Sequence, residues 1–166
     1  LIYNLGGNGF KIEGSSDTIY SGNTSNNIIA GDIAGSGRYA LVTETQGYPS
    51  SLSVYLTDNT VQYKYDFSEY YVTDISLNSD GTRAAVSGIT AKDGGIVSAV
   101  YIFDFSNPEP ISILTYNEVL MEKVEYMDNG TVAAIGDTTT SMINGTTGEK
   151  VDYNYQSRQM TDYAID

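Results

Sequence analysis

The sequence predicts an all-β fold of the β-propeller type, in which consecutive four-stranded antiparallel meanders, the blades, stack side by side. Three observations predict it. Apolar residues alternate with polar ones or form short β-branched runs, and the only segment with helical spacing, 117–124, is short. A strand–glycine turn–strand unit occurs around Gly37, Gly81 and Gly130, at about the 40–50-residue period of a blade. A second hairpin follows each unit, so each repeat holds four strands.

Strands A and B of each repeat flank the glycine turn. Asp-Gly and Asn-Gly are strong hairpin turns because both central positions tolerate a positive φ. Small residues in strand B suit the crowded inner part of a blade. Strands A and B are expected at 33–35 and 39–44, at 72–77 and 83–89, and at 122–127 and 131–136.

Strands C and D form the second hairpin of each repeat. In the second repeat, Pro108 and Pro110 fall in the connection, where a missing N–H breaks no ladder bond. One such sheet buries too little apolar surface alone, so neighbouring sheets must stack. A β-sandwich of similar strands is the alternative, although a sandwich requires no repeated four-stranded unit. Strands C and D are expected at 52–57 and 61–67, at 97–105 and 111–115, and at 140–143 and 150–155.

The two ends of the chain share one further blade. Segments 1–4, 9–13 and 18–22 resemble strands B, C and D without a strand A, and 160–166 resembles the missing strand A. Because the sequence starts at Leu1 directly with a strand pattern, we expect a fragment or a processed chain that lacks its true N-terminus. The predicted domain is a single propeller-like unit, 1–166, with complete blades at 28–70, 71–117 and 118–156 and a split blade made of 1–27 and 157–166.

The split blade predicts how the chain closes. Residues 1–4 would leave an open strand edge, and open edges promote aggregation unless they are paired. We expect the C-terminal strand A to pair with this edge. Pairing within one chain would give a small four-bladed ring, and pairing between two chains, which we favour slightly, would give a strand-exchanged homodimer.

The amino-acid composition excludes several classes of function. The chain has 8 basic and 21 acidic residues, a net charge of −13, and no basic cluster, which argues against nucleic-acid binding. The acidic excess is interpreted first as an aid to solubility and second as a surface for a cation or a cationic partner. Without Cys or His, the chain lacks thiolates, the commonest general base and the commonest transition-metal ligand. We therefore expect no cofactor and no bound metal. With no run of about 20 apolar residues, we expect no membrane contact by this fragment.

Three segments resemble a known group of proteins: SGRYALVTE at 36–44, YYVTDISLNSDGTRAAV at 70–86 and VYIFDF at 100–105. They resemble WD-like, YVTN-type bacterial propeller repeats, and more closely an uncharacterised family of propeller-like proteins from clostridial bacteria. The resemblance implies a membrane anchor and a longer propeller in the full-length protein, hence an extracellular or cell-surface location, and no assigned activity. The Trp-Asp dipeptide of true WD repeats is absent, so the scaffold role of those repeats is not carried over.

Carboxylates are the available acid–base groups. Asp32, Asp74 and Asp162 share one position of the repeat, at the start of strand A. One interpretation is a ring of carboxylates that binds a cation at the mouth of a channel. The favoured interpretation is that each accepts backbone N–H bonds or caps a turn. Lys123 occupies this position in the third repeat and interrupts the ring.

Tyrosine is the other signal, with fifteen in the chain. Most fall in strands, where packing explains them. In an A–D meander the B–C and D–A loops share one end of the blade, and this end carries the more variable loops, at 46–49, 68–71, 90–95 and 156–159. Tyr48, Tyr70 and Tyr71 belong to it, and we predict them as ligand-binding residues of a glycan or peptide surface.

The function favoured by these observations is a non-catalytic binding or scaffold module at a cell surface, with a protein or glycan as its partner. One alternative is a carboxylate-based carbohydrate-active enzyme, a hydrolase or lyase, which would need two converging carboxyl groups about 5–10 Å apart. The other is a purely structural part of a longer propeller whose site lies outside this fragment. Fold alone does not separate these alternatives. We expect no buried carboxylate pair at the B–C/D–A end.

Overall fold

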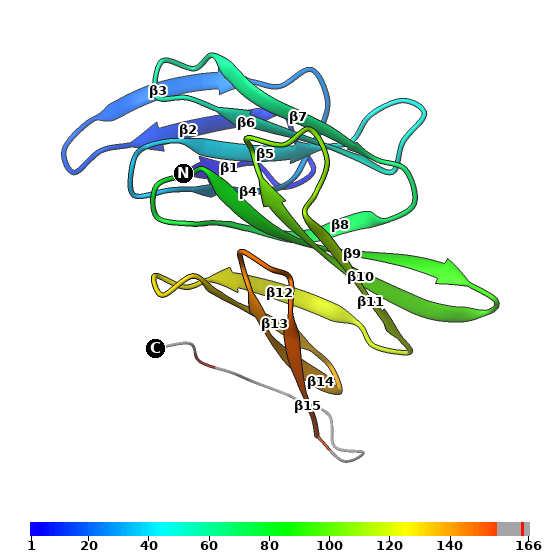
Figure 1. Ribbon diagram of the computed structural model, residues 1–166. Helices are drawn as coiled ribbons and strands as arrows, with labels where there is room; N and C mark the ends of the chain where they lie inside the picture. The colour runs from blue at the N-terminus through cyan, green and yellow to red at the C-terminus, as the bar shows by residue number, and fades with distance from the viewer. Residues whose placement is uncertain (156–163, 165–166) are drawn as a thin grey trace.

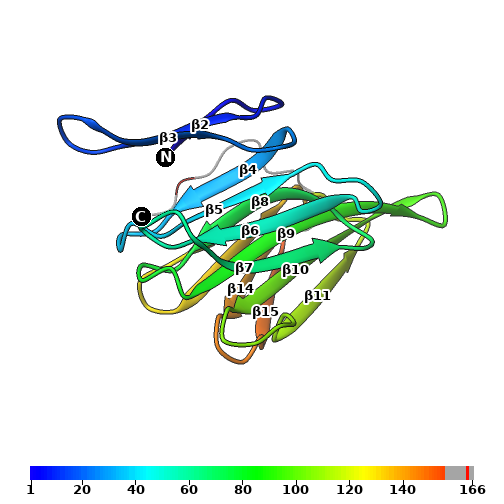
Figure 2. The same cartoon turned by 90° about the horizontal axis from the view of Figure 1, so that it is seen from above.

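The computed structural model describes residues 1–155 and Ala164, and within them it contains fifteen strands and no helix (Figure 1). The strands form one three-stranded and three four-stranded antiparallel sheets, which are stacked in a row as propeller-like blades (Figures 1 and 2). The predicted all-β, propeller-like fold is therefore confirmed. The N-terminal sheet contains β1 (Ile2–Tyr3), β2 (Gly9–Glu13) and β3 (Thr18–Asn23).

Each complete blade is a simple meander in which the strand order follows the chain. The first blade contains β4 (Ile28–Ile33), β5 (Tyr39–Thr43), β6 (Ser50–Tyr55) and β7 (Val61–Phe67). The second contains β8 (Tyr71–Leu77), β9 (Arg83–Lys92), β10 (Gly95–Asp104) and β11 (Ser112–Asn117). The third contains β12 (Met121–Tyr126), β13 (Thr131–Gly136), β14 (Thr139–Asn144) and β15 (Lys150–Asn154).

One local expectation differs from the structure. The strand expected at 33–35 ends at Ile33 and begins at Ile28, because a bulge between Ile28 and Ala30 breaks the period-two alternation. The short segment 117–124 forms no helix, as expected: it contains the end of β11, a connection and the start of β12.

The three glycine turns have one geometry. Gly37, Gly81 and Gly130 have φ values of 87°, 70° and 83°, in the region that favours glycine. The N–H of each glycine donates to the carbonyl three residues earlier, at distances of 2.9, 3.0 and 2.9 Å. These matching bonds align the strands A of the three blades residue by residue.

This alignment corrects the expected equivalence of the aspartates. Asp32 lies five residues before its turn glycine and matches Ser76, whereas Asp74 lies seven residues before its glycine and matches Lys123. The expected alignment of Asp32 with Asp74 is therefore off by two residues. A shift of two keeps every side chain on the same face of a strand, so the hydrophobic pattern could not reveal it. Asp162 lies outside the described residues.

Both aspartates bond to the backbone of the next blade. Asp32 accepts the N–H of Leu77 at 2.7 Å, and Asp74 accepts the N–H of Val124 at 3.0 Å. Ser76, at the position of Asp32, accepts the N–H of Tyr126 at 2.9 Å. The side chains of one strand A thus satisfy amides on strand A of the next blade, as in the favoured interpretation.

Burial raises the pKa of Asp32 above its usual value, an effect increased by the nearby Asp74 charge and opposed by the Leu77 bond. The folded chain therefore holds this proton more tightly than the unfolded chain. The resulting stabilisation is complete below the unfolded pKa and is lost as the pH rises through the folded pKa. Wherever this carboxyl is ionised, its desolvation therefore works against folding.

We accordingly expect Asp32→Asn, which keeps an oxygen for Leu77, to match or exceed the stability of the parent chain at pH 7. The stability advantage of Asp32→Asn over the parent chain should shrink as the pH falls, because protonation then makes the parent carboxyl neutral as well. Asp32→Ala removes the acceptor and should cost about 1–3 kcal/mol at both pH values. Urea unfolding at pH 7 and pH 4.5 measures this difference. A stability of Asp32→Asn at pH 7 that is as low as that of Asp32→Ala would show that the charge itself is needed.

Serine hydroxyls make a second repeated contact between blades. Ser50 at the start of β6 accepts the N–H of Val72 at 3.1 Å, and Ser98 on β10 accepts the N–H of Met121 at 3.0 Å. The two serines occupy the same position of strand C, and the two amides occupy the same position of strand A. The blade-to-blade contact is therefore a repeated unit, like the blade itself.

Apolar side chains fill the spaces between blades. Phe103 of β10 is fully buried and packs its ring against the β7 rings of Tyr65 and Phe67, with centroids 5.1 and 6.2 Å away. The N-terminal sheet packs on the first blade through Phe10 and Tyr39, whose centroids are 5.7 Å apart. Its backbone is joined to β4 by a parallel bridge between Leu5 and Ile28. The strand expected at 160–165, and its pairing with 1–4, lie almost entirely outside the described residues.

Candidate functional site

The three tyrosines predicted from the sequence lie at the same end of the blades but differ in exposure. Tyr48, in the loop between β5 and β6, and Tyr71, the first residue of β8, are 47% and 61% exposed. Tyr70 is only 5% exposed and packs edge-on against Tyr101, with centroids 6.0 Å apart. Neighbouring residues of an extended chain point to opposite faces, so Tyr71 faces solvent while Tyr70 faces the interior.

The long β9–β10 hairpin extends this end of the second blade. Both strands have ten residues, more than any other strand, and the hairpin projects beyond the neighbouring blades (Figures 1 and 2). At its tip Asp93 and Gly94 have φ values of 50° and 81°. This is the geometry of a two-residue type I′ turn, which keeps the hairpin narrow to its tip.

A hollow of about 350 Å³ lies beside the outer part of this hairpin, near its tip, where β11 ends and the chain passes toward β12. Tyr70 and Val97 supply its apolar wall, and the remaining residues are exposed and polar. The lining residues are Tyr70, Lys92, Asp93, Val97, Thr115, Asn117 and Glu118.

Glu118 is held at the rim of the hollow by the backbone. Its N–H donates to the carbonyl of Ile96 at 2.9 Å, and its φ is 54°, which is unusual for a residue with a side chain. The Glu118 carboxylate lies against Gly95, where a Cβ atom would clash with it. Gly95 therefore allows the carboxylate to rest on the hairpin.

The remaining groups give the hollow mixed polarity. Burial raises the pKa of the Tyr70 phenol above its usual value, with the charge of Glu69 adding to the effect, so the hydroxyl stays protonated at neutral pH. The Lys92 ammonium lies 4.0 Å from the Glu69 carboxylate, and both side chains are exposed. Thr115 and Asn117 add a hydroxyl and an amide. The hollow thus offers hydrogen-bond donors and acceptors beside one aromatic ring.

The carboxylates that line this hollow are few and exposed. Among the described residues, no group of three or more Asp or Glu side chains is placed to hold a metal ion. Asp93 and Glu118 both line the hollow, but both are exposed. A catalytic carboxylic acid is usually desolvated, which these are not.

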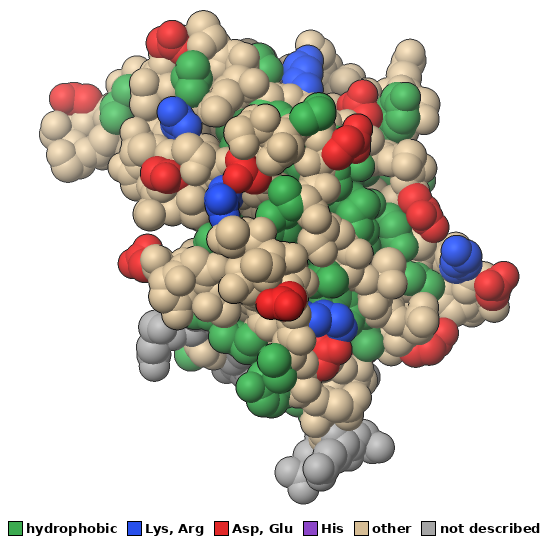
Figure 3. Space-filling model, viewed as in Figure 1, with side chains coloured by type: hydrophobic (Ala, Val, Ile, Leu, Met, Phe, Trp, Pro, Cys, Tyr) green, Lys and Arg blue, Asp and Glu red, His purple; other side chains and the backbone are tan. Residues whose placement is uncertain are grey.

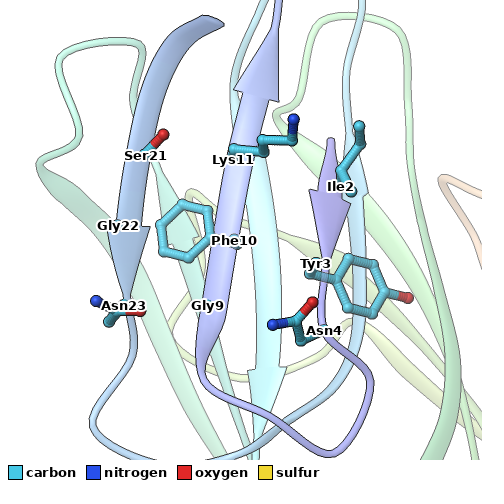
Figure 4. Close-up of a pocket in the computed structure, with 9 residues that line it drawn as sticks. All are labelled: Ile2, Tyr3, Asn4, Gly9, Phe10, Lys11, Ser21, Gly22 and Asn23. Carbon is cyan, nitrogen blue, oxygen red and sulfur yellow. The ribbon is translucent and has the colours of Figure 1, made fainter.

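Two further hollows lie at the N-terminal sheet. One, of about 440 Å³, lies between this sheet and the first blade, and Ile12, Tyr20 and Ile33 contribute to its walls. The other, of about 370 Å³, lies over the sheet itself, with Asn4 and Asn23 on either side of Gly9 (Figure 4). Neither contains a residue predicted from the sequence. On the face shown in Figure 3, acidic and basic side chains are interspersed rather than clustered.

Sequence reasoning named Tyr70 and segment 90–95, which it expected as a loop but which forms the strand ends and the turn at the tip of the β9–β10 hairpin; it missed Thr115, Asn117 and Glu118. These three residues lie at the end of strand D and in the D–A loop, at the same end of the blade as segment 90–95. The sequence offered one hint: this D–A loop lies at the same end of the blade as the tip of the β9–β10 hairpin. Its residues are ordinary polar ones and match no motif.

A family model described as a family of unknown function, DUF5711, matches residues 1–161. The chain belongs to the DUF5711 family. A search of curated proteins gave no match to this DUF5711 chain. Among solved structures, it is similar to one titled crystal structure of the eukaryotic initiation factor, with a TM-score of 0.61 and 10% sequence identity. The match covers 81% of this chain and 33% of that one, so the DUF5711 chain spans about a third of its length. At this identity the similarity supports the fold alone. Among the described residues, no helix is long and apolar enough to cross a membrane.

Proposed function

We propose that the DUF5711 chain is a non-catalytic binding module that holds a short glycan in the hollow beside the outer part of the β9–β10 hairpin. The observation that carries this proposal is the lining of the hollow: Val97 and the small exposed part of Tyr70 form its apolar wall, and Asn117 and Thr115 supply an amide and a hydroxyl. Sugars combine an apolar ring face with several hydroxyl groups, and such a surface offers a partner for each. The volume of about 350 Å³ lies at the low end for small-ligand sites, which favours a segment of one or two sugars.

The exposed rings of Tyr48 and Tyr71 extend this surface at the same end of the blades. Exposed tyrosines supply large, rigid contact areas at a low cost in conformational entropy. They would contact parts of a glycan that leave the hollow. A peptide partner would use the same rings, and the experiment below includes it as a contrary outcome.

We further propose that this module acts at a cell surface, as part of a longer, membrane-anchored propeller. The resemblance of segments 36–44, 70–86 and 100–105 to clostridial propeller-like proteins supports this location. A binding site on loops at one end of a rigid stack of blades suits an exposed surface protein.

The test is a glycan and peptide array screened with the 166-residue chain, followed by calorimetric titration of the best ligand. We expect a glycan ligand, and Asn117→Ala and Thr115→Ala should each weaken it about tenfold through the loss of one hydrogen bond. Tyr71→Ala should weaken longer glycans more than short ones. Asn107→Ala, an exposed asparagine in the β10–β11 turn at the opposite end of the blade, is the matched control and should bind normally.

Three results would contradict the proposal. One is an array without any glycan ligand, as expected of a purely structural part of a propeller. Another is selection of peptides only, and the third is a glycan whose affinity is unchanged by Asn117→Ala and Thr115→Ala.

A carbohydrate-active hydrolase or lyase is the second candidate, and one observation favours it: Asp93 and Glu118 line the same hollow. Such an enzyme would cleave the glycan ligand and release a new sugar end. Incubating the ligand with the chain and measuring its cleavage separates the two functions. If the chain cleaves the ligand, and Asp93→Asn or Glu118→Gln abolishes the cleavage, the chain is an enzyme rather than a non-catalytic binding module.

A further inference from the structure

The hollow between the N-terminal sheet and the first blade lies inside the row of blades and takes no part in the proposed function. It has a volume of about 440 Å³, and both of its walls lie within residues 12–59. The N-terminal sheet supplies one wall, with Ile12, Ile19 and Tyr20, and the β4–β5 and β6–β7 turns of the first blade supply most of the other. These turns lie at the opposite end of the blades from Tyr70, so the hollow is separate from the one proposed for a glycan.

The contact between the first and second blades shows what fills the same place one blade further along the chain. Strand C has a bulge at the same point in the N-terminal sheet and in the first blade, directly after Ile12 and directly after Val54. The strand D partner of Ile12 is Tyr20, and the strand D partner of Val54 is Tyr63. Tyr20 and Tyr63 therefore occupy equivalent positions at two successive contacts.

The Tyr63 ring extends to the turns of the second blade. Its centroid lies 5.0 Å from that of Phe105, and its hydroxyl donates to the carbonyl of Pro108 at 2.7 Å. Pro108 comes four residues after the end of β10, and Asn59, which lines the hollow, comes four residues after the end of β6. The hollow thus lies where, at the next contact, a phenol ring meets a turn carbonyl.

Tyr20 does not extend into this place, because the residue two positions later is a glycine. A Cβ atom at Gly22 would lie 3.0 Å from Cε1 and 3.1 Å from the hydroxyl oxygen of Tyr20, so the Tyr20 ring lies over Gly22. In the first blade, Tyr65 occupies the position of Gly22. A side chain at that position leaves no room for Tyr63 to lie the same way.

The polar groups around the hollow suit a neutral ligand. The side-chain oxygen of Asn59 accepts the hydroxyl of Tyr39 at 3.0 Å, which fixes the position of Asn59 at the turn. Thr57 adds an exposed hydroxyl. The Glu13 carboxylate also lines the hollow and is paired with the Lys11 ammonium at 2.6 Å. This carboxylate and the net charge of −13 disfavour an anionic ligand.

We propose that this hollow binds the phenol ring of a ligand, which is either a small phenolic compound or a tyrosine side chain of a peptide. The ring packs against the apolar side chains of Ile12 and Ile19, and its hydroxyl donates to the carbonyl of Asn59, as Tyr63 donates to Pro108. The volume of about 440 Å³ falls within the range of small-ligand sites and leaves room for groups attached to the ring.

The test is an NMR titration of the ¹⁵N-labelled 166-residue chain with N-acetyl-tyrosinamide, N-acetyl-phenylalaninamide and p-cresol. Ligands of fewer than about 20 atoms bind weakly, so concentrations of about 0.1–10 mM are used. We expect the amide signals of residues 34–37 and 57–60 to shift. N-acetyl-phenylalaninamide lacks the hydroxyl and should bind about fivefold more weakly than N-acetyl-tyrosinamide.

The p-cresol titration distinguishes the two sources of the ring. Tighter binding of N-acetyl-tyrosinamide than of p-cresol identifies a tyrosine of a peptide as the ligand, because the peptide groups then contribute. Equal or weaker binding of N-acetyl-tyrosinamide identifies a small phenolic compound.

Gly22→Ala tests why the hollow exists. Its methyl group would take the place of the Tyr20 ring, which should turn into the hollow as Tyr63 does, leave less than about a tenth of the chains open and weaken binding at least about tenfold. Gly9→Ala, in the same sheet, is the matched control. A Cβ atom there meets only the side chains of Asn23 and Asn4, at 3.4 and 3.5 Å, so binding should be unchanged.

A second variant, Ile19→Ala, removes part of an apolar wall from a side chain that is 70% exposed, so it leaves the fold intact. It should weaken binding about threefold, whereas Ile113→Ala on β11, also exposed, should not. Three results overturn the proposal. One is the absence of shifts at residues 34–37 and 57–60, and another is equal affinity for the tyrosine and phenylalanine amides. The third is unchanged binding by Gly22→Ala or Ile19→Ala.

Discussion

Replacing Phe103 by alanine is expected to lower the free energy of unfolding by about 3–5 kcal/mol, the range for fully buried aromatic side chains. The Phe103 ring lies between the first and second blades and contacts rings from both. Its removal leaves a cavity that neighbouring strands cannot fill, because both sheets are fixed by their own ladders. Equilibrium unfolding in urea, followed by tyrosine fluorescence, measures the change.

The control for this substitution is Val61→Ala on β7, an exposed strand residue of the first blade. It should change the unfolding free energy by less than about 0.5 kcal/mol. A loss below about 1 kcal/mol for Phe103→Ala would mean that the contact between the two blades contributes little to stability.

Gly81→Ala is expected to destabilise the chain by about 3 kcal/mol, for two reasons that add. The positive φ of 70° costs an alanine about 1–2 kcal/mol. In addition, a Cβ atom would lie 2.7 Å from Cβ of Arg38 and 3.1 Å from Cβ of Ala34, in the turn of the neighbouring blade, and overpacking of this kind costs about 1–3 kcal/mol. The turn cannot easily retreat, since Ser36 donates its N–H to Ser79 and its hydroxyl to the Asp80 carbonyl, at 3.1 and 2.8 Å.

Gly130→Ala separates the two causes. Gly130 occupies the same turn position in the third blade, with a φ of 83°, but no atom lies within 4 Å of a Cβ built there. Its substitution should therefore cost only about 1–2 kcal/mol, the backbone part. Thermal or urea unfolding of both variants gives the difference. Equal losses for Gly81→Ala and Gly130→Ala would mean that the turns of adjacent blades do not press on each other as the structure has them.

The repeat architecture could be predicted from the sequence because local chemistry determines it. Asp-Gly and Asn-Gly turns and period-two strands depend on neighbouring residues, so the three meanders and their hairpins are visible without any knowledge of contacts. The first strand of the first blade was misplaced because a bulge at Ile28–Ala30 interrupts its alternation. The register of the aspartates was misjudged because a shift of two residues leaves the pattern of a strand unchanged.

The candidate site was less predictable, because it depends on packing between segments. Tyr70 and Tyr71 are adjacent and chemically identical, yet only the direction of the strand decides that one is buried and the other exposed. Thr115 and Asn117 meet Lys92 only because the second blade has an unusually long hairpin. Nothing in the spacing of these residues along the chain predicts that Thr115, Asn117 and Lys92 line the same hollow.

The hydrogen bonds between successive strands A also show which residues a blade must carry to be added to the array. The acceptor, such as Asp32 or Ser76, belongs to one blade, and the amide that it satisfies belongs to the next. A blade duplicated or exchanged between relatives must therefore carry an acceptor for its successor and expose an amide to its predecessor. Both must stand at fixed distances from the turn glycine. Gene duplication can lengthen such an array without a new kind of interface, because each added blade carries both the acceptor for the next blade and the amide for the previous one.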